Sequence, residues 1–239
     1  MKSIAEKISP LETQAQALSA LDNELANDMV SVVSFINAHA YTMAHANPAF
    51  KDCLLNSNLL FRDGIGAKIL LSRYNKPAGY NANGTDLIPL LLSKFKGKSV
   101  CFIGTESPYI EQAATKCKSE GHNILAHMDG FQDNETMFEF VEEHQPDILI
   151  LGMGMPKQEY FAAFLQKHYA NPLVVVNGGA IFDFMANRFS RAPSIFRKLN
   201  LEWLYRLMNE PVRLFNRYVI GIPKFFWLLS INKRRERIG

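Results

Sequence analysis

The chain has 239 residues, a hydrophobic fraction of 48% and a formal net charge of +3, which suits one large domain, or one domain with an appendage, with an ample core. Its three cysteines, Cys53, Cys101 and Cys117, are scattered without metal-ligand spacing, which excludes a disulfide framework and favours reduced thiols in the cytosol. No apolar run approaches the roughly 18 residues of a membrane span, and residues 1–27 read as a polar helix without a signal-peptide core.

The net charge divides unevenly along the chain. Residues 187–239 hold twelve Lys or Arg and three Glu, which gives +9. Residues 1–186 hold fourteen Lys or Arg and twenty Asp or Glu, which gives −6. We therefore expect an α/β domain over residues 1–190 and a basic, helical C-terminal appendage over residues 191–239. Such an appendage predicts an anionic partner: a membrane surface, a pyrophosphate group or a nucleic acid.

Short apolar runs alternate with helical patterns along the chain. This alternation is typical of an open, mostly parallel, Rossmann-like sheet with helices on both faces. The expected strands are 30–36, 58–62, 99–103, 123–126, 147–151 and 173–176, and the expected helices are 48–56, 65–74, 86–94, 108–120, 134–144 and 156–169.

Polar residues and glycines follow each expected strand. Because ligands of such sheets bind beyond the carboxyl ends of the strands, these positions are candidates for a binding site. Each one alone also fits ordinary turn chemistry, so the hypothesis rests on their meeting at one edge. They are Asn37, Asp63-Gly64, Gly104-Thr105, Asp129-Gly130, residues 152–159 and Asn177-Gly178-Gly179.

The segment after the fifth strand has the features of an anion site. Gly152 and Gly154 allow a tight turn and close backbone approach, and Pro156 suits the first position of a helix. Lys157, Gln158 and Glu159 then fall in the first helical turn, where free N–H groups and the helix dipole attract negative charge. The alternative is a strand-to-helix turn that binds nothing.

Asp63 is the candidate general base. It ends a strand and precedes Gly64-Ile65-Gly66, where a carboxylate can accept a proton from an attacking hydroxyl. Asp also serves commonly as a helix N-cap. Sequence alone does not separate the two roles.

The C-terminal region carries arginines and a cluster of aromatic residues. If one helix holds Arg206, Arg213 and Arg217, their spacings of seven and four form one stripe able to bind phosphates, or a plain solvated face. Residues 225–229 are Phe-Phe-Trp-Leu-Leu, and basic residues follow at 233–237. This composition favours a membrane interface over a helix buried in the core or in an oligomer interface. The aromatics are not interleaved with the charges, so nucleic acid is not expected.

Four motifs give the chain a family resemblance that runs from about residue 30 to residue 218. It resembles the WecG/TagA/CpsF glycosyltransferases. The motifs are Arg62-Asp63-Gly64-Ile65-Gly66, Asn83-Gly84-Thr85-Asp86-Leu87, the Gly152–Gly154 turn with Pro156-Lys157-Gln158-Glu159, and Leu201-Glu202-Trp203-Leu204-Tyr205-Arg206-Leu207.

The resemblance implies an inverting transfer of a sugar from a UDP-sugar to a polyprenyl-diphosphate-linked sugar. It places the enzyme peripherally at the cytoplasmic face of the bacterial inner membrane, in teichoic-acid, enterobacterial-antigen, capsule or exopolysaccharide synthesis. The donor sugar stays open among N-acetylmannosamine, its uronic acid, glucose and galactose. The acceptor, its linkage and any homo-oligomer also stay open.

Matched residue by residue, the resemblance assigns roles to several positions. The family's base falls on Asp63, its strand-end Asn on Asn37, and its Gln on Gln158, while an Arg usual in the family is replaced here by Asn81. The family's appendage arginines fall on Arg191, Arg206, Arg213 and Arg217. With the strand-end and motif residues, the substrate-binding set becomes Asn37, Asp86, Gly104, Gly152, Gly154, Lys157, Gln158, Glu159, Asn177, Gly178, Arg191, Arg206, Arg213 and Arg217.

We expect neither a metal nor another cofactor. The sequence contains no Asp-x-Asp motif, and its six histidines show no ligand spacing. Arginines and helix N-termini would then meet the charge of the leaving UDP. Two alternatives remain: a nucleotide-dependent oxidoreductase, weakened because the turn lacks the Gly-x-Gly-x-x-Gly pattern, and a non-catalytic peripheral membrane protein, which leaves the polar strand ends unexplained.

Overall fold

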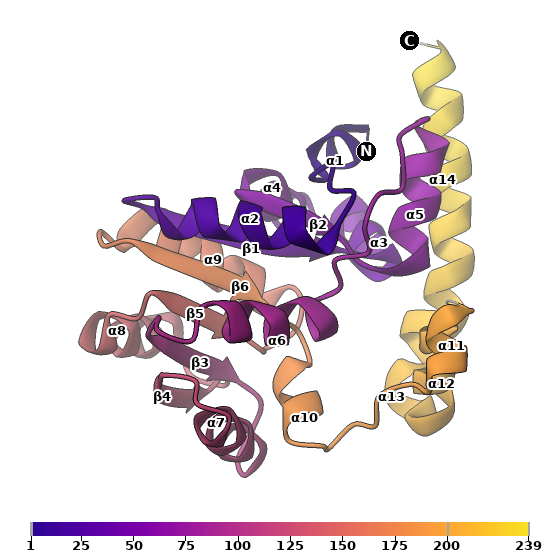
Figure 1. Cartoon of the computed structure of the whole chain (residues 1–239). Helices are drawn as coiled ribbons and strands as arrows, with labels where there is room; N and C mark the ends of the chain where they lie inside the picture. The colour runs from indigo at the N-terminus through magenta and orange to yellow at the C-terminus, as the bar shows by residue number, and fades with distance from the viewer. Residues whose placement is uncertain (1, 200, 239) are drawn as a thin grey trace.

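Six parallel strands form one open sheet at the centre of the molecule (Figure 1). The structure, a computed structural model, describes residues 2–199 and 201–238, and the side chains of residues 3–196, 199 and 201–231. The strands are β1 (Val30–Ile36), β2 (Leu59–Arg62), β3 (Val100–Gly104), β4 (Ile124–Asp129), β5 (Ile148–Leu151) and β6 (Leu173–Asn177), in the order β2-β1-β6-β5-β3-β4. The predicted fold class is therefore confirmed.

Helices cover both faces of the sheet. Along β5, Ile148 and Ile150 join one buried cluster, whereas Leu149 and Leu151 join another on the opposite face. This two-residue alternation explains why a strand buried on both sides reads as a continuous apolar run. The helices before the appendage are α1 (Lys2–Lys7), α2 (Gln14–Leu25), α3 (Ala38–Ala46), α4 (Pro48–Asn56), α5 (Gly64–Arg73), α6 (Gly84–Lys94), α7 (Tyr109–Ser119), α8 (Asn134–His144), α9 (Lys157–His168) and α10 (Ile181–Met185).

Most expected elements appear within a few residues of their predicted bounds. β4 continues three residues beyond the expected 123–126. Pro156 is the N-cap of α9 instead of its first residue. Helix α3 was not predicted. Asn37 begins it by accepting from the N–H of Ala40, and the N–H of Asn47 bonds to Met43 at its end.

The appendage is a chain of short helices followed by a long one. They are α11 (Ser194–Lys198), α12 (Glu202–Asn209), α13 (Pro211–Phe215), the π-helical η1 (Asn216–Ile220) and α14 (Gly221–Ile238). The predicted single arginine stripe is wrong in its geometry. Pro211 begins a new helix, and Glu210 before it leaves the helical conformation, with φ −134° and ψ 58°, because a proline disfavours that conformation in the residue before it. Arg206, Arg213 and Arg217 thus lie on three successive elements.

Helix α14 is partly built into the core. The side chains of Phe225, Leu228 and Leu229 are at most 5% exposed and join the cluster that includes Tyr41 of α3. The rings of Tyr41 and Phe225 meet edge to face, with centroids 5.4 Å apart. The rejected alternative, a helix buried in a core, is therefore correct for this face of α14. The basic residues at 233–237 lie outside the described side chains.

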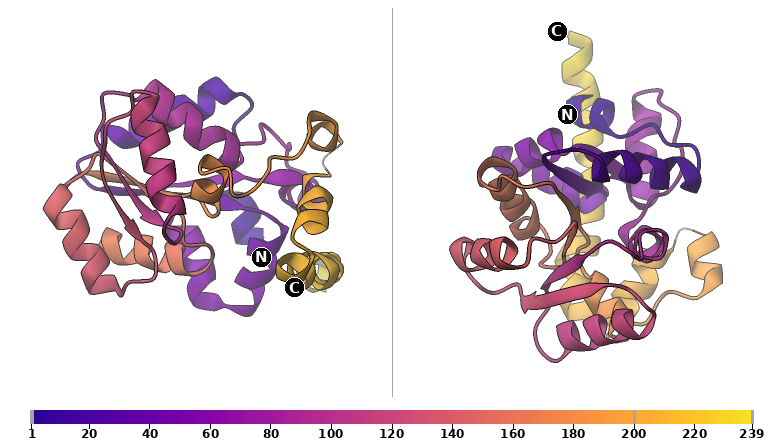
Figure 2. Two further views of the ribbon diagram at one scale, coloured as in Figure 1. Left: turned by 90° about the horizontal axis from the view of Figure 1, so that it is seen from below. Right: turned by 60° about the vertical axis from the view of Figure 1, so that its left-hand side comes forward.

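The appendage stands beside the carboxyl edge of the sheet. In Figure 1 the strand arrowheads point toward the side where α14 rises, and Figure 2 shows the C-terminal helices gathered on one side of the molecule. Within the part of the chain that the structure describes, no helix combines the length and apolar character that a membrane crossing requires.

Candidate active site

Asn37 and Asp63 lie side by side at the carboxyl edge of the sheet. β1 and β2 pair in a register that joins Ile36 to Arg62, so the residues after them are adjacent. Asn37 Nδ2 donates to Oδ2 of Asp63 over 3.1 Å. Asp63 occupies the N-cap position of α5, but its side chain makes no capping hydrogen bond. Its carboxylate therefore keeps acceptor capacity for a hydroxyl at this edge.

The loop before α6 completes the start of α5. The backbone N–H of Gly64 donates to Oδ1 of Asn81 over 2.7 Å. The guanidinium of Arg62 donates to the carbonyl oxygens of Gly64, Gly79 and Tyr80 over 3.2 to 3.3 Å. Gly64 has φ +77°, a conformation in which a side chain would be strained. These contacts fix the backbone on both sides of the candidate base.

Gln158 ties together the turns that follow β5 and β6. Its Oε1 accepts from the backbone N–H of Gly154 over 3.2 Å and of Gly179 over 3.0 Å. Its Nε2 donates to Oε1 of Glu159 over 2.8 Å. The side chain of Gln158 is only 1% exposed. The polar atoms of its side chain form hydrogen bonds within the protein, and its direct contact with a substrate stays a prediction.

Glu159 is a buried carboxyl group directed into the protein. It is 2% exposed, and its Oε2 has no hydrogen-bond partner. Burial raises the pKa of Glu159 to about 7, and the hydrogen bond from Gln158 opposes that rise. Burial and then the nearby charge of Glu159 raise the pKa of the Cys53 thiol on α4. Glu159 thus faces the α4 side, and its binding of substrate also stays a prediction.

The predicted ligand-binding glycines have different surroundings. A Cβ atom at Gly104 or Gly152 would collide with the ring of Phe182, and one at Gly178 would collide with the helix that follows it. These three glycines therefore permit close packing of α10. Gly154, with φ +76°, has open space where a Cβ would be. Of the four, Gly154 is the position where a ligand has room to approach the backbone.

Two other predicted contacts also bond within the protein. Asn177 is 3% exposed and donates through Nδ2 to Ser34 Oγ over 2.9 Å, while its buried Oδ1 has no partner. The ammonium group of Lys157 donates to the carbonyl oxygen of Gln132 over 3.0 Å. This contact joins the start of α9 to the loop after β4.

Asp86 and Arg191 meet each other across the start of α6. The guanidinium of Arg191 donates to Oδ1 of Asp86, and Asn83 Nδ2 donates to Oδ2 over 2.8 Å. Asp86 lies in the first turn of α6, where a carboxylate is favourable. The structure thus brings together two residues that the sequence placed in the same site but did not pair.

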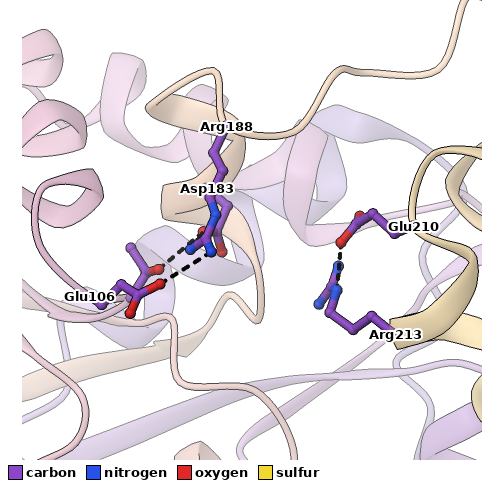
Figure 3. Close-up of polar contacts among 6 residues, drawn as sticks. Glu106, Asp183, Arg188, Glu210 and Arg213 are labelled. Carbon is purple, nitrogen blue, oxygen red and sulfur yellow. Dashed lines mark hydrogen bonds and ion pairs between the residues drawn. The ribbon is translucent and has the colours of Figure 1, made fainter.

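A polar cluster, of which the sequence singled out only Thr105, holds α10 against the end of β3. Asp183 is 8% exposed and accepts from Thr105 Oγ1 over 3.0 Å. The guanidinium of Arg188 pairs with Asp183 over 3.2 Å and with Glu106 over 3.1 Å (Figure 3). The same group stacks on the Tyr109 ring, 4.2 Å from its centroid. Its sequence signal is weak, because the acid and its arginine are five residues apart.

The appendage arginines lie on the α10 segment and near α3. Arg206 lies 4.8 Å from the Phe184 ring centroid, and Arg213 lies 4.7 Å from that of Phe189. Arg213 also pairs with Glu210 (Figure 3). Arg217 comes near the first turn of α3. There, burial and then the charge of Arg217 lower the pKa of His39 to about 4.

The described side chains include no group of three or more His, Cys, Asp or Glu arranged to hold a metal ion. A model of the family described as "Glycosyl transferase WecG/TagA/CpsF family" matches residues 4–239. The chain belongs to this glycosyltransferase family.

Two relatives from the family match most of this chain. An N-acetylglucosaminyldiphosphoundecaprenol N-acetyl-beta-D-mannosaminyltransferase of Bacillus spizizenii is 31% identical over 187 residues, which cover 76% of this chain and 72% of the relative. A Staphylococcus aureus protein of the same name is 26% identical over 218 residues, which cover 89% and 84%. The chain is thus a WecG/TagA/CpsF glycosyltransferase.

The structure shows what the side chain of Asn81 does at this position. Asn81 stands where the resemblance places an arginine, and its side-chain oxygen holds the N–H of Gly64. Two residues that sequence reasoning did not single out, Asp183 and Arg188, hold α10 against the end of β3. Arg62, which begins a quoted motif, holds the backbone near the candidate base.

Proposed function

We propose that the protein transfers a sugar from a UDP-sugar to a saccharide carried on a polyprenyl diphosphate, with inversion, in the synthesis of a bacterial surface polysaccharide. The observation that carries the proposal is the Asp63 carboxylate at the sheet edge. Asn37 orients it, and it makes no capping hydrogen bond to the helix that follows. Relatives are named for transfer to N-acetylglucosaminyldiphosphoundecaprenol, which supports a lipid-linked acceptor.

In the proposed mechanism Asp63 removes the proton from the attacking hydroxyl of the acceptor. That hydroxyl attacks the anomeric carbon of the donor from the face opposite UDP, and the bond to UDP breaks. Negative charge then grows on the leaving diphosphate. The N-terminal end of α9, beside the open space at Gly154, and the arginines of the appendage are the positive groups that would meet this charge, and no metal is needed for this step.

We further propose that the appendage docks on the cytoplasmic face of the membrane. Nine of the twelve exposed large hydrophobic residues found among the described side chains belong to residues 195–227. Val212, Phe215 and Val219 have helical spacing, and Val212 is 94% exposed. An apolar face beside a basic terminus suits the interface of a bilayer that contains anionic lipids. Residues 191–239 would then be the part that brings residues 1–190 to the lipid-linked acceptor.

The test is a screen of UDP-sugars against a short-chain polyprenyl-diphosphate saccharide, with linkage analysis of the product. We expect one donor to give a product whose new bond is inverted relative to the donor. Hydrolysis alone, or a retained configuration, would contradict the proposal. For the membrane, Val212→Ser with Trp227→Ser should weaken binding to phosphatidylglycerol vesicles. The exposed loop variant Phe131→Ser is the control.

A further inference from the structure

A groove runs between α5 and α14, beside the candidate base. It has a volume of about 460 Å³, and its apolar walls come from Ile65 and Ile69 of α5 and from Phe226 and Leu229 of α14. On its other side α14 packs along α3, where Phe225 meets Tyr41, and the groove lies between α14 and α5. Lys68, Ser72, Arg73, Asn75 and Ser230 supply its polar lining.

The groove starts next to the site. Asp63 is the N-cap of α5, and Ile65 lies in the first turn of that helix. Lys68 follows Asp63 by five residues, which is about 7.5 Å along a helix axis. If the acceptor sugar presents its hydroxyl to Asp63, the diphosphate on that sugar lies about one hexose ring away, near Lys68.

Two cations in the groove have no counter-ion among the described side chains. Lys68 and Arg73 are exposed, and neither cation has an acidic side chain within ion-pair distance among the residues whose side chains are described. A ligand with an anionic group on an apolar hydrocarbon chain would therefore match the groove. The cations would bind the anionic group, and the isoleucine and phenylalanine side chains would pack against the hydrocarbon chain.

We propose that this groove binds the prenyl diphosphate part of the acceptor, with Lys68 on the diphosphate and Ile69 and Phe226 against the first isoprene units. The assignment rests on the proposed function, because it takes the hydroxyl at Asp63 as its fixed point. It gives α14 a direct part in substrate binding besides its packing in the core.

The experiment is a titration of the full-length protein with farnesyl diphosphate, followed by calorimetry, with inorganic pyrophosphate and farnesol as separate probes. We expect farnesyl diphosphate to bind better than either fragment. A lost charge-assisted contact should weaken it about tenfold or more in Lys68→Glu. Phe226→Asp should also weaken it. Lys118→Glu on α7 and Phe131→Asp, both exposed and away from the groove, should bind as the unchanged protein does.

Kinetic constants test acceptor binding in the groove separately from the transfer reaction. In transfer assays, Lys68→Glu should raise the acceptor KM and leave the donor KM unchanged. No binding of farnesyl diphosphate, or equal binding by Lys68→Glu and its control, would overturn the groove even if transfer proceeds. Binding that depends on Lys68, with no transfer from any donor, would keep the groove and refute the proposed function. If Lys68→Glu unfolds, Arg73→Glu provides the same test.

Discussion

Gln158 and Glu159 form a buried hydrogen-bonded pair, in which Nε2 of Gln158 donates to Oε1 of Glu159 over 2.8 Å. The donation leaves Gln158 Oε1 directed at the N–H groups of Gly154 and Gly179. The orientation of the amide, and with it the contact between the two glycine turns, therefore depends on a carboxyl group that substrate does not need to touch.

The pair predicts a pH-dependent stability. The folded protein raises the pKa of Glu159 from 4.5 to about 7, so between these values it holds a proton that the unfolded chain has released. The free energy of unfolding should then fall as pH rises from about 4.5 to 7, by at most about 3 kcal/mol from this group. Urea unfolding at pH 5 and pH 8 measures it, with Glu159→Gln expected to lack this fall.

The control is Glu139→Gln, an exposed carboxyl on α8, which should follow the unchanged protein. Identical pH dependence of Glu159→Gln and the unchanged protein would show that Glu159 is not buried in solution as it is in the structure.

His39 reports on the position of the appendage. Burial, and after it the charge of Arg217, lower its pKa to about 4. Arg217→Ala should therefore raise the pKa of His39, measured by NMR titration of the imidazole protons. Arg206→Ala, whose guanidinium lies on Phe184, should leave it unchanged. An unmoved His39 pKa in Arg217→Ala would mean that Arg217 does not lie near His39 in solution.

Two neighbouring phenylalanines should differ sharply in their effect on stability. Phe225 is 1% exposed, whereas Phe226 is 47% exposed. Phe225→Ala should lower the free energy of unfolding by about 3–5 kcal/mol, and Phe226→Ala by at most about 0.5 kcal/mol. Chemical denaturation of both variants checks this. Equal effects would contradict the packing of α14 on α3. A chain that stops near Ser190 should be destabilised for the same reason, because it lacks Phe225, Leu228 and Leu229 of this buried cluster.

Most of the sheet could be predicted from the sequence, because strands buried on both faces need uninterrupted apolar runs such as 148–151 and 173–176. Helix α3 is hard to predict because residues 38–46 are mostly small or apolar and show little amphipathic pattern. Its signal was the pair of asparagines, Asn37 and Asn47, that border it. The spacing of Phe225, Leu228 and Leu229 marks one helix face, and it could have identified the side of α14 that packs in the core.

The sequence predicted which residues belong to the candidate site, but it predicted few of the contacts between their side chains. The adjacency of Asn37 and Asp63 follows from parallel pairing of β1 and β2, which sequence order alone does not fix. The inward orientation of Gln158 and the pairing of Arg191 with Asp86 depend on side-chain directions that motifs do not encode. The single arginine stripe is wrong because Pro211, a helix boundary between Arg206 and Arg213, begins a new helix.

Metal removal tests the proposed role of the positive groups. If N–H groups and arginines alone meet the charge of the leaving UDP, transfer should proceed at an unchanged rate in excess EDTA. The measurement is UDP release with and without chelator. Activity lost in EDTA and restored by Mg²⁺ or Mn²⁺ would contradict this part of the mechanism.

The most direct test of the account is the turnover of Asp63→Asn with lipid-linked acceptor and UDP-sugar. Asn keeps the size of the side chain but cannot remove the proton, so kcat should fall about 10²–10⁴-fold. The free energy of unfolding and the affinity for UDP should stay unchanged. Turnover by Asp63→Asn within a few-fold of the unchanged protein would show that another group is the base.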